Sequence, residues 1–102
     1  MTHTITILTA ARNIIADPDM WYQGGDWTAS GKWNTSEPCC AECAIKRAAH
    51  ALGVHPFDAI KHTWGFTPNH GGLDKFNDRP ATTHADVLAV FDRAIASLED
   101  KP

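Results

Sequence analysis

The residues with the clearest potential for chemistry are the three cysteines, Cys39, Cys40 and Cys43, which lie in one alanine-rich stretch. If this stretch is a helix, Cys40 and Cys43 share one stripe of it with Arg47 and His50. The positive end of a helix dipole favours a thiolate near the first turn, and Arg47 adds positive charge one turn from Cys43. This pattern indicates either a reactive thiol or a metal site that histidines from other segments complete.

A simpler interpretation, which we favour, is that the cysteines are buried structural thiols, small and apolar like their alanine neighbours. Free cysteine is among the most frequently buried residue types. The Cys-Cys-x-x-Cys spacing also lacks the second cysteine pair, or the paired histidines, of the usual zinc sites. A Cys-His-Asn catalytic group with Asn77 as its orienting residue would need a geometry that a sequence does not show. We therefore expect no cofactor and lean towards a non-enzymatic protein.

A second candidate feature is the loop-rich segment 20–35, which contains Trp21, Gln23, Trp27 and Trp33. These side chains could form an aromatic recognition surface or the wall of a pocket. The alternative, which we favour for the tryptophans, is that they cover the helical core, because aromatic rings in a small domain usually fill the core.

Asn77 and Asp78 form a third candidate binding feature, just before Arg79-Pro80. Short Asx side chains also bond to nearby backbone groups and stabilise turns. On that mechanism we favour a role in holding the loop over direct contact with a ligand.

The elements that position these residues are predicted to be mainly α-helical, with three principal helices over residues 6–16, 38–53 and 83–98. A Trp-rich loop or a small β-hairpin turned at Ser30-Gly31 is expected between the first two helices. The domain is predicted to be a single globular unit over residues 1–98, and residues 99–102 should fray.

Each principal helix has an apolar face and recognisable ends. The first helix has its face at Ile7, Leu8, Ala11, Ile14 and Ile15, and a short strand at its start is a weaker alternative. The central helix starts near Ser36 and stops at Gly53. Its face consists of Ala41, Ala44, Ile45, Ala48 and Leu52. The last helix opens with a capping-box-like pair, Thr83 and Asp86. Its face consists of Val87, Phe91, Ala94, Ile95 and Leu98.

A shorter helix is predicted over residues 57–63, with Phe57, Ile60 and Trp64 facing the core. One further helical turn is expected over 73–76, and the stretch that follows it, Asn77 to Pro80, should break that turn.

The composition excludes several functions. The chain has 102 residues and a net charge of −3 without a basic cluster, which argues against nucleic-acid binding. It contains no apolar run of membrane length and no basic-then-apolar leader, so we expect a cytoplasmic protein that does not bind a membrane. The odd cysteine count argues against a disulfide framework.

Four pieces of the chain, in order, resemble an uncharacterised family of small actinobacterial and actinophage proteins. They are Trp21-Tyr22-Gln23-Gly24, Cys43-Ala44-Ile45, Phe76-Asn77-Asp78-Arg79-Pro80, and the stretch from Thr83 to Ile95. In this chain Lys46-Arg47 follow the cysteine piece, where the family commonly has small residues, and Phe76 stands where it commonly has tryptophan. The family has no assigned activity, so the resemblance implies membership and not a mechanism.

These observations lead to three functional hypotheses. The first is a small non-enzymatic binding protein with a protein partner, which would be a host protein or host defence if the chain is phage-encoded. The second is a cysteine-dependent enzyme or a metal protein that uses Cys39, Cys40, Cys43 and His50. The third is a small-molecule sponge with an aromatic pocket, which ranks lower because the chain has no glycine-rich phosphate loop.

Overall fold

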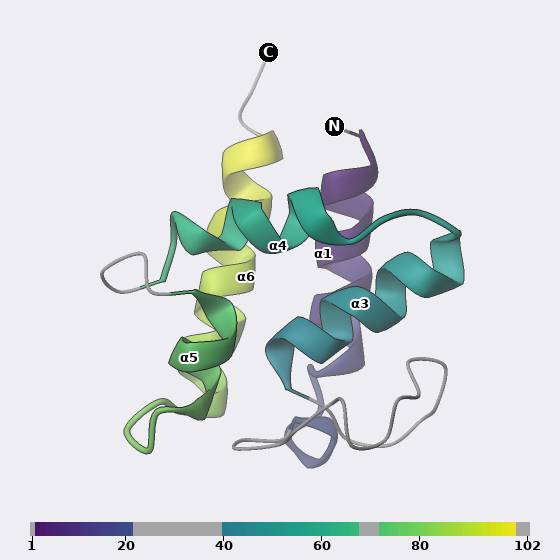
Figure 1. Ribbon diagram of the computed structural model, residues 1–102. Helices are drawn as coiled ribbons and strands as arrows, with labels where there is room; N and C mark the ends of the chain where they lie inside the picture. The colour runs from purple at the N-terminus through teal and green to yellow at the C-terminus, as the bar shows by residue number, and fades with distance from the viewer. Residues whose placement is uncertain (1, 22–39, 68–71, 100–102) are drawn as a thin grey trace.

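The computed structural model describes residues 2–21, 40–67 and 72–99. These residues form five α-helices and one short 3-10 helix (Figure 1). The elements are α1 (Thr2–Ile14), η1 (Pro18–Met20), α3 (Ala41–Leu52), α4 (Phe57–Trp64), α5 (Leu73–Asp78) and α6 (His84–Glu99). The mainly helical prediction is therefore confirmed. The count of three principal helices leaves out α4 and α5, which lie where the shorter helical stretches were expected. The predicted hairpin lies outside the described residues.

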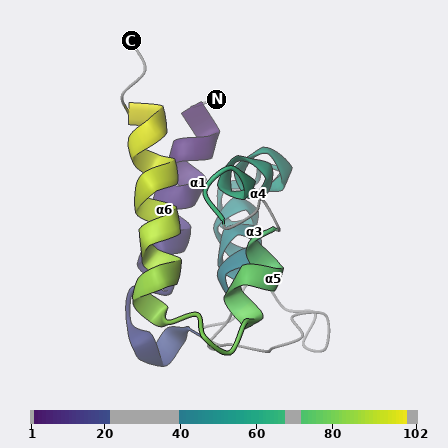
Figure 2. The same ribbon diagram turned by 90° about the vertical axis from the view of Figure 1, so that its left-hand side faces the viewer.

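The helices pack in two layers. In Figures 1 and 2, α1 and α6 run antiparallel side by side, and α3, α4 and α5 lie against one face of that pair. α3 packs on α1, while α4 crosses and contacts both α1 and α6. α5 closes the second layer through contacts with α3 and α4.

The core forms between the α1–α6 pair and the layer of α3, α4 and α5, with the alanine-rich side of α3 against α1. On α1 the fully or nearly fully buried residues are Ile7, Leu8 and Ala11, with Ile15 just beyond the helix. On α3 they are Ala41, Cys43, Ala44, Ile45, Arg47, Ala48 and Ala49, and on α6 they are Val87, Val90, Phe91 and Ala94. The predicted burial of the alanine-rich face is confirmed for Ala41, Ala44, Ile45 and Ala48, but Leu52 is 45% exposed and does not belong to the buried face.

The first helix begins and ends earlier than predicted. α1 covers Thr2–Ile14 in place of residues 6–16, and the alternative of a strand at its start is wrong. Thr4 is buried on the same helix as Ile7 and Leu8. Burial against α3 and α6 therefore outweighs the modest helix propensity of the β-branched residues in this stretch.

The central helix, by contrast, starts later than predicted. Its N-cap is Cys40, whose Sγ accepts a hydrogen bond from the backbone N–H of Cys43 at 3.4 Å, so the helix begins at Ala41. The expected start at Ser36 lies outside the described residues. The predicted stop is confirmed, because Gly53 adopts the left-handed conformation with φ of 72° and its N–H bonds back to the last turn.

The short helix α4 buries Ile60 as predicted but exposes the two aromatic residues that were expected beside it. Phe57 is 51% exposed and Trp64 is 39% exposed, whereas Ala59, Ile60 and Thr63 are buried. The expectation that both aromatic residues face the core is thus wrong. α4 lies across α1 and α6, and the small side chains of Ala59 and Thr63 suit that close crossing better than bulky rings do.

The prediction was wrong for the end of α5 and right for the start of α6. α5 continues through Asn77 and Asp78, which were expected to break it, and Arg79 is its C-cap. The capping box of α6 is confirmed, because Thr83 Oγ1 accepts from the Asp86 N–H at 3.1 Å and Asp86 Oδ2 accepts from the Thr83 N–H at 3.0 Å.

Candidate functional site

The side chain of Asn77 joins three segments that are far apart in the sequence. Its Oδ1 accepts one hydrogen bond from Trp21 Nε1 at 2.6 Å and another from the backbone N–H of Ala41 at 3.1 Å. Its Nδ2 donates to Asp78 Oδ1 at 3.0 Å. Both partners of Oδ1 are obligatory donors, so the orientation of the amide follows from the contacts. Ala41 is the first residue of α3, and Asn77 thereby satisfies an N–H that the helix itself leaves open.

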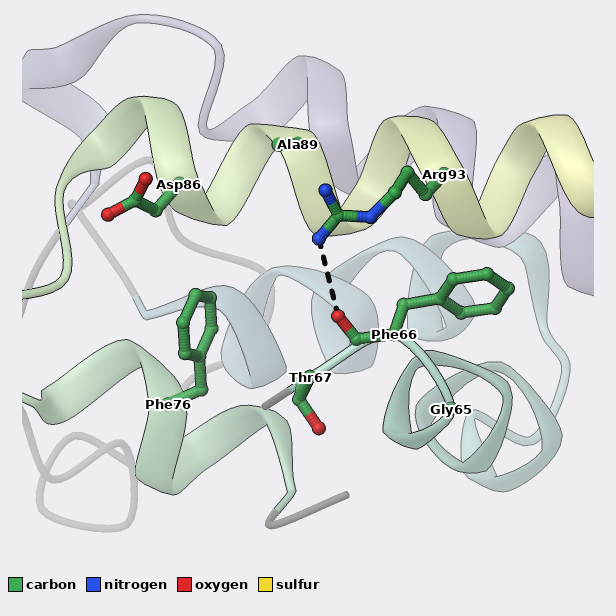
Figure 3. Close-up of a pocket in the computed structure, with 7 residues that line it drawn as sticks. All are labelled: Gly65, Phe66, Thr67, Phe76, Asp86, Ala89 and Arg93. Carbon is green, nitrogen blue, oxygen red and sulfur yellow. Dashed lines mark hydrogen bonds between the residues drawn. The ribbon is translucent and has the colours of Figure 1, made fainter. Parts of the chain in front are cut away.

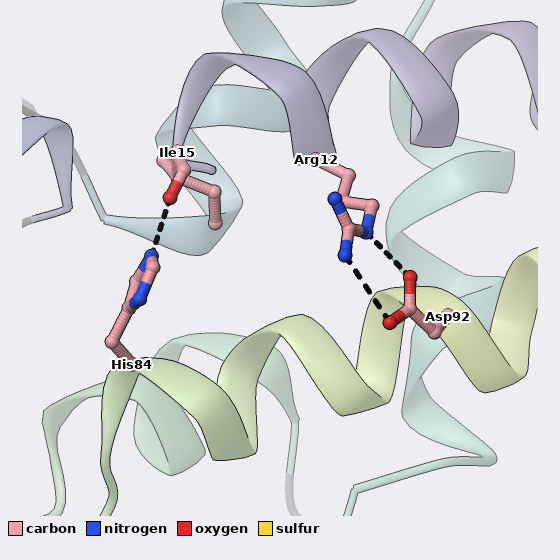
Figure 4. Close-up of polar contacts among 4 residues, drawn as sticks. All are labelled: Arg12, Ile15, His84 and Asp92. Atoms are coloured by element: carbon pink, nitrogen blue, oxygen red, sulfur yellow. Dashed lines mark hydrogen bonds and ion pairs between the residues drawn. The ribbon is translucent and has the colours of Figure 1, made fainter. Parts of the chain in front are cut away.

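Trp21 is held from two sides at this junction. Its indole N–H donates to Asn77, and its ring lies 5.7 Å from the ring of His84, centroid to centroid. His84 Nε2 contacts the carbonyl oxygen of Ile15 at 2.6 Å (Figure 4). Because a carbonyl oxygen only accepts, Nε2 carries the hydrogen in this contact. The junction therefore fastens the chain after α1 to the starts of α3 and α6.

This junction brings together residues from three of the four pieces on which the family resemblance rests, namely Trp21, Asn77 and His84. Its other member, Ala41, lies two residues before the cysteine piece. Asn77 is fully buried and offers no surface to a partner. Its contacts support a structural role over a direct binding role. Asp78 is exposed next to it. The other proposed binding residues, Gln23, Trp27 and Trp33, lie outside the described residues.

The cysteines at the start of α3 are buried thiols. Cys40 and Cys43 are 7% and 3% exposed, and Cys39 lies outside the described residues. Burial raises the pKa of Cys40 to about 11, even though the hydrogen bond from the Cys43 N–H lowers it. Loss of hydration thus outweighs the helix terminus, which alone would favour a thiolate. His50 is exposed, and the described part of the chain contains no group of three or more metal-ligating residues.

An aromatic surface that the sequence did not indicate lies on the outside of α4. We define the α4 outer face as Phe57, Lys61 and Trp64, which follow one another at helical spacing. Lys61 Nζ lies 5.2 Å from the centroid of the Phe57 ring, within the range of a cation–π contact. The ring of His55 meets Phe57 edge-on at 6.3 Å. Helical spacing alone did not reveal this orientation, because it groups Ala59 and Thr63 with Ile60 as readily as it groups the two aromatic residues.

A groove of about 560 Å³ runs along α6 (Figure 3). We call it the α5–α6 groove, and it is lined by Gly65, Phe66, Thr67, Phe76, Asp86, Ala89 and Arg93. The turn after α4 gives it a fixed wall, because Thr67 Oγ1 donates to the Trp64 carbonyl at 3.0 Å. Arg93 Nη2 donates to the Phe66 carbonyl at 3.4 Å. No sequence pattern marked this groove, since its residues come from three separate segments.

The described residues thus define a small, mainly helical protein whose thiols are buried and whose outer surface carries an aromatic helix face and a charged groove. The chain belongs to a family of unknown function, DUF6197, whose model matches residues 1–97. This match confirms the resemblance at the level of the family. Neither the curated proteins nor the solved structures include a match to the chain. Among the described helices, none has the length and apolar character needed to span a membrane.

Proposed function

We propose that this protein is a non-enzymatic protein-binding domain and that the α4 outer face is part of its contact surface. The observation that carries the proposal is the exposure of Phe57 and Trp64, 51% and 39%, on one face of one helix. Tryptophan and other aromatic side chains dominate the energy of protein interfaces because they bury large apolar areas at low entropic cost.

The spacing of the face indicates how a partner would bind it. Phe57, Lys61 and Trp64 stand at the i, i+4 and i+7 positions that helices use when they dock into an apolar groove. Lys61 carries a positive charge against the Phe57 ring, so a partner with an acidic group beside an apolar groove complements this surface best. Gln23, Trp27 and Trp33 remain proposed additions to it.

The alternative of a cysteine-dependent enzyme receives less support from the described residues. A nucleophilic cysteine needs a lowered pKa and access to its substrate, whereas Cys40 is buried with a pKa of about 11. If the chain is phage-encoded, the partner that we propose is a host protein or a component of host defence, encountered in the cytoplasm.

A site-specific crosslinking experiment tests the proposal. A photoreactive amino acid at position 58, which is exposed beside the α4 outer face, should give a discrete adduct in lysate of the organism in which the chain acts. The double variant Phe57→Ser/Trp64→Ser should lose the adduct. The control Leu52→Ser removes an apolar side chain of similar exposure outside this face and should retain it. An adduct of equal yield in the double variant, folded by circular dichroism, would remove α4 from the interface.

A further inference from the structure

We infer that the α5–α6 groove binds an extended peptide segment of a partner protein, one with an acidic and a basic side chain about three residues apart and apolar side chains between them. The inference rests on the proposed protein-binding function but uses a surface separate from the α4 outer face. The groove's volume of about 560 Å³ lies within the range of roughly 300–1,000 Å³ typical of ligand pockets.

The charges of the groove define the chemistry of the segment. Asp86 and Arg93 lie on the same side of α6, two turns apart, which places them about 10 Å from each other along the helix axis. Between them lies Ala89, and Phe76 faces the Asp86 end across the groove (Figure 3). An extended chain in the polyproline II conformation advances about 9 Å in three residues and brings every third side chain back to the same side, so opposite charges at that spacing match both ends of the groove.

Both charged groups keep bonding capacity for a ligand. Asp86 uses Oδ2 to cap α6, and its other carboxylate oxygen is available to a basic side chain. The Arg93 guanidinium has five N–H donors, of which one contacts the Phe66 carbonyl at 3.4 Å. That contact holds the guanidinium over the groove, where it can receive a carboxylate from the segment.

Selection from a display library of random heptapeptides on the full chain tests this inference. The enriched peptides should carry the charge pair, and a selected peptide should shift the amide resonances of Thr67, Phe76 and the α6 residues from Asp86 to Arg93. Asp86→Asn, which keeps an oxygen to cap the helix, and Arg93→Gln should each weaken binding by about two- to fivefold, because exposed ion pairs contribute little. Arg93→Glu should bind a peptide whose acidic residue is replaced by lysine more tightly than it binds the original peptide.

Several results would overturn the inference. Enriched peptides without the charge pair would do so. Binding of a selected peptide to Asp86→Asn and Arg93→Gln as tightly as to the native chain would do so too. Dimerisation abolished by Arg93→Glu would assign the groove to a second copy of the chain. Binding of a free dipeptide as tightly as the heptapeptide would assign it to a small molecule. The Phe57→Ser/Trp64→Ser variant should bind the peptide normally, because its changes lie on the α4 outer face. Peptide binding to the groove and partner binding to the α4 outer face can therefore fail independently of each other.

Discussion

The hydrogen bonds of Asn77 make its replacement the sharpest test of how this fold is held together. Asn77→Ala removes the acceptor of both the Trp21 indole N–H and the Ala41 backbone N–H. A buried donor left without a partner costs about 1–3 kcal/mol. The Ala41 bond is buried and the Trp21 bond is partly buried, so we expect an unfolding free energy lower by about 2–5 kcal/mol, the emptied side-chain volume included.

Such a loss is large for a chain of this length, whose total stability is of the order of 5–15 kcal/mol. Urea unfolding followed by far-ultraviolet circular dichroism would measure it, with the slope of the transition unchanged if the native fold is retained. Asn77→Leu fills the same space but leaves both donors without an acceptor. It should therefore stay destabilised by about 2 kcal/mol, which separates the hydrogen bonds from the cavity.

A double-mutant cycle isolates the contact between the two side chains. Trp21→Phe retains an aromatic ring and removes the indole N–H, and alone it should cost about 1 kcal/mol. In the Asn77→Ala background, Trp21→Phe should cost less, because it removes the indole N–H that Asn77→Ala has left without an acceptor. The coupling energy between the two side chains should be about 1 kcal/mol. If Asn77→Leu is as stable as the native chain, or the coupling is zero, the account of this junction is refuted.

Two further predictions concern ionisable groups. The Cys40 thiol should resist alkylation at neutral pH until the protein is unfolded. Its folded pKa of about 11 exceeds the ordinary 9.0, so the unfolded thiol ionises first and the unfolding free energy should fall as pH rises from about 9 to 11. Cys40→Ala should lack that part of the fall, and an identical pH profile would contradict the prediction. The exposed Arg12–Asp92 ion pair joins α1 and α6 (Figure 4). Its coupling energy in a double-mutant cycle should be less than about 1 kcal/mol and should decrease as salt is added. A coupling energy well above this value that does not change with salt would be incompatible with a surface ion pair.

Local patterns were sufficient to predict much of the fold. The apolar periodicity of residues 83–98, with the Thr83 and Asp86 cap, predicted α6 within one residue at each end, because the side chains that start and bury that helix are its own. Gly53 ended α3 for the same local reason. α4 was oriented wrongly, because helical spacing groups Phe57, Ile60 and Trp64 as readily as Ala59, Ile60 and Thr63. Only the close crossing over α1 and α6 selects the smaller set.

The sequence by itself determined the helical class, the family and the motif residues, since those depend on residue types and on neighbours along the chain. The tertiary structure decided what the motif residues do. Burial of Asn77 turned a candidate contact residue into the acceptor for Trp21 and Ala41, and burial of Cys40 raised a pKa that the helix terminus alone would have lowered. Both outcomes depend on the removal of water by segments distant in the chain, and no local spacing encodes that removal.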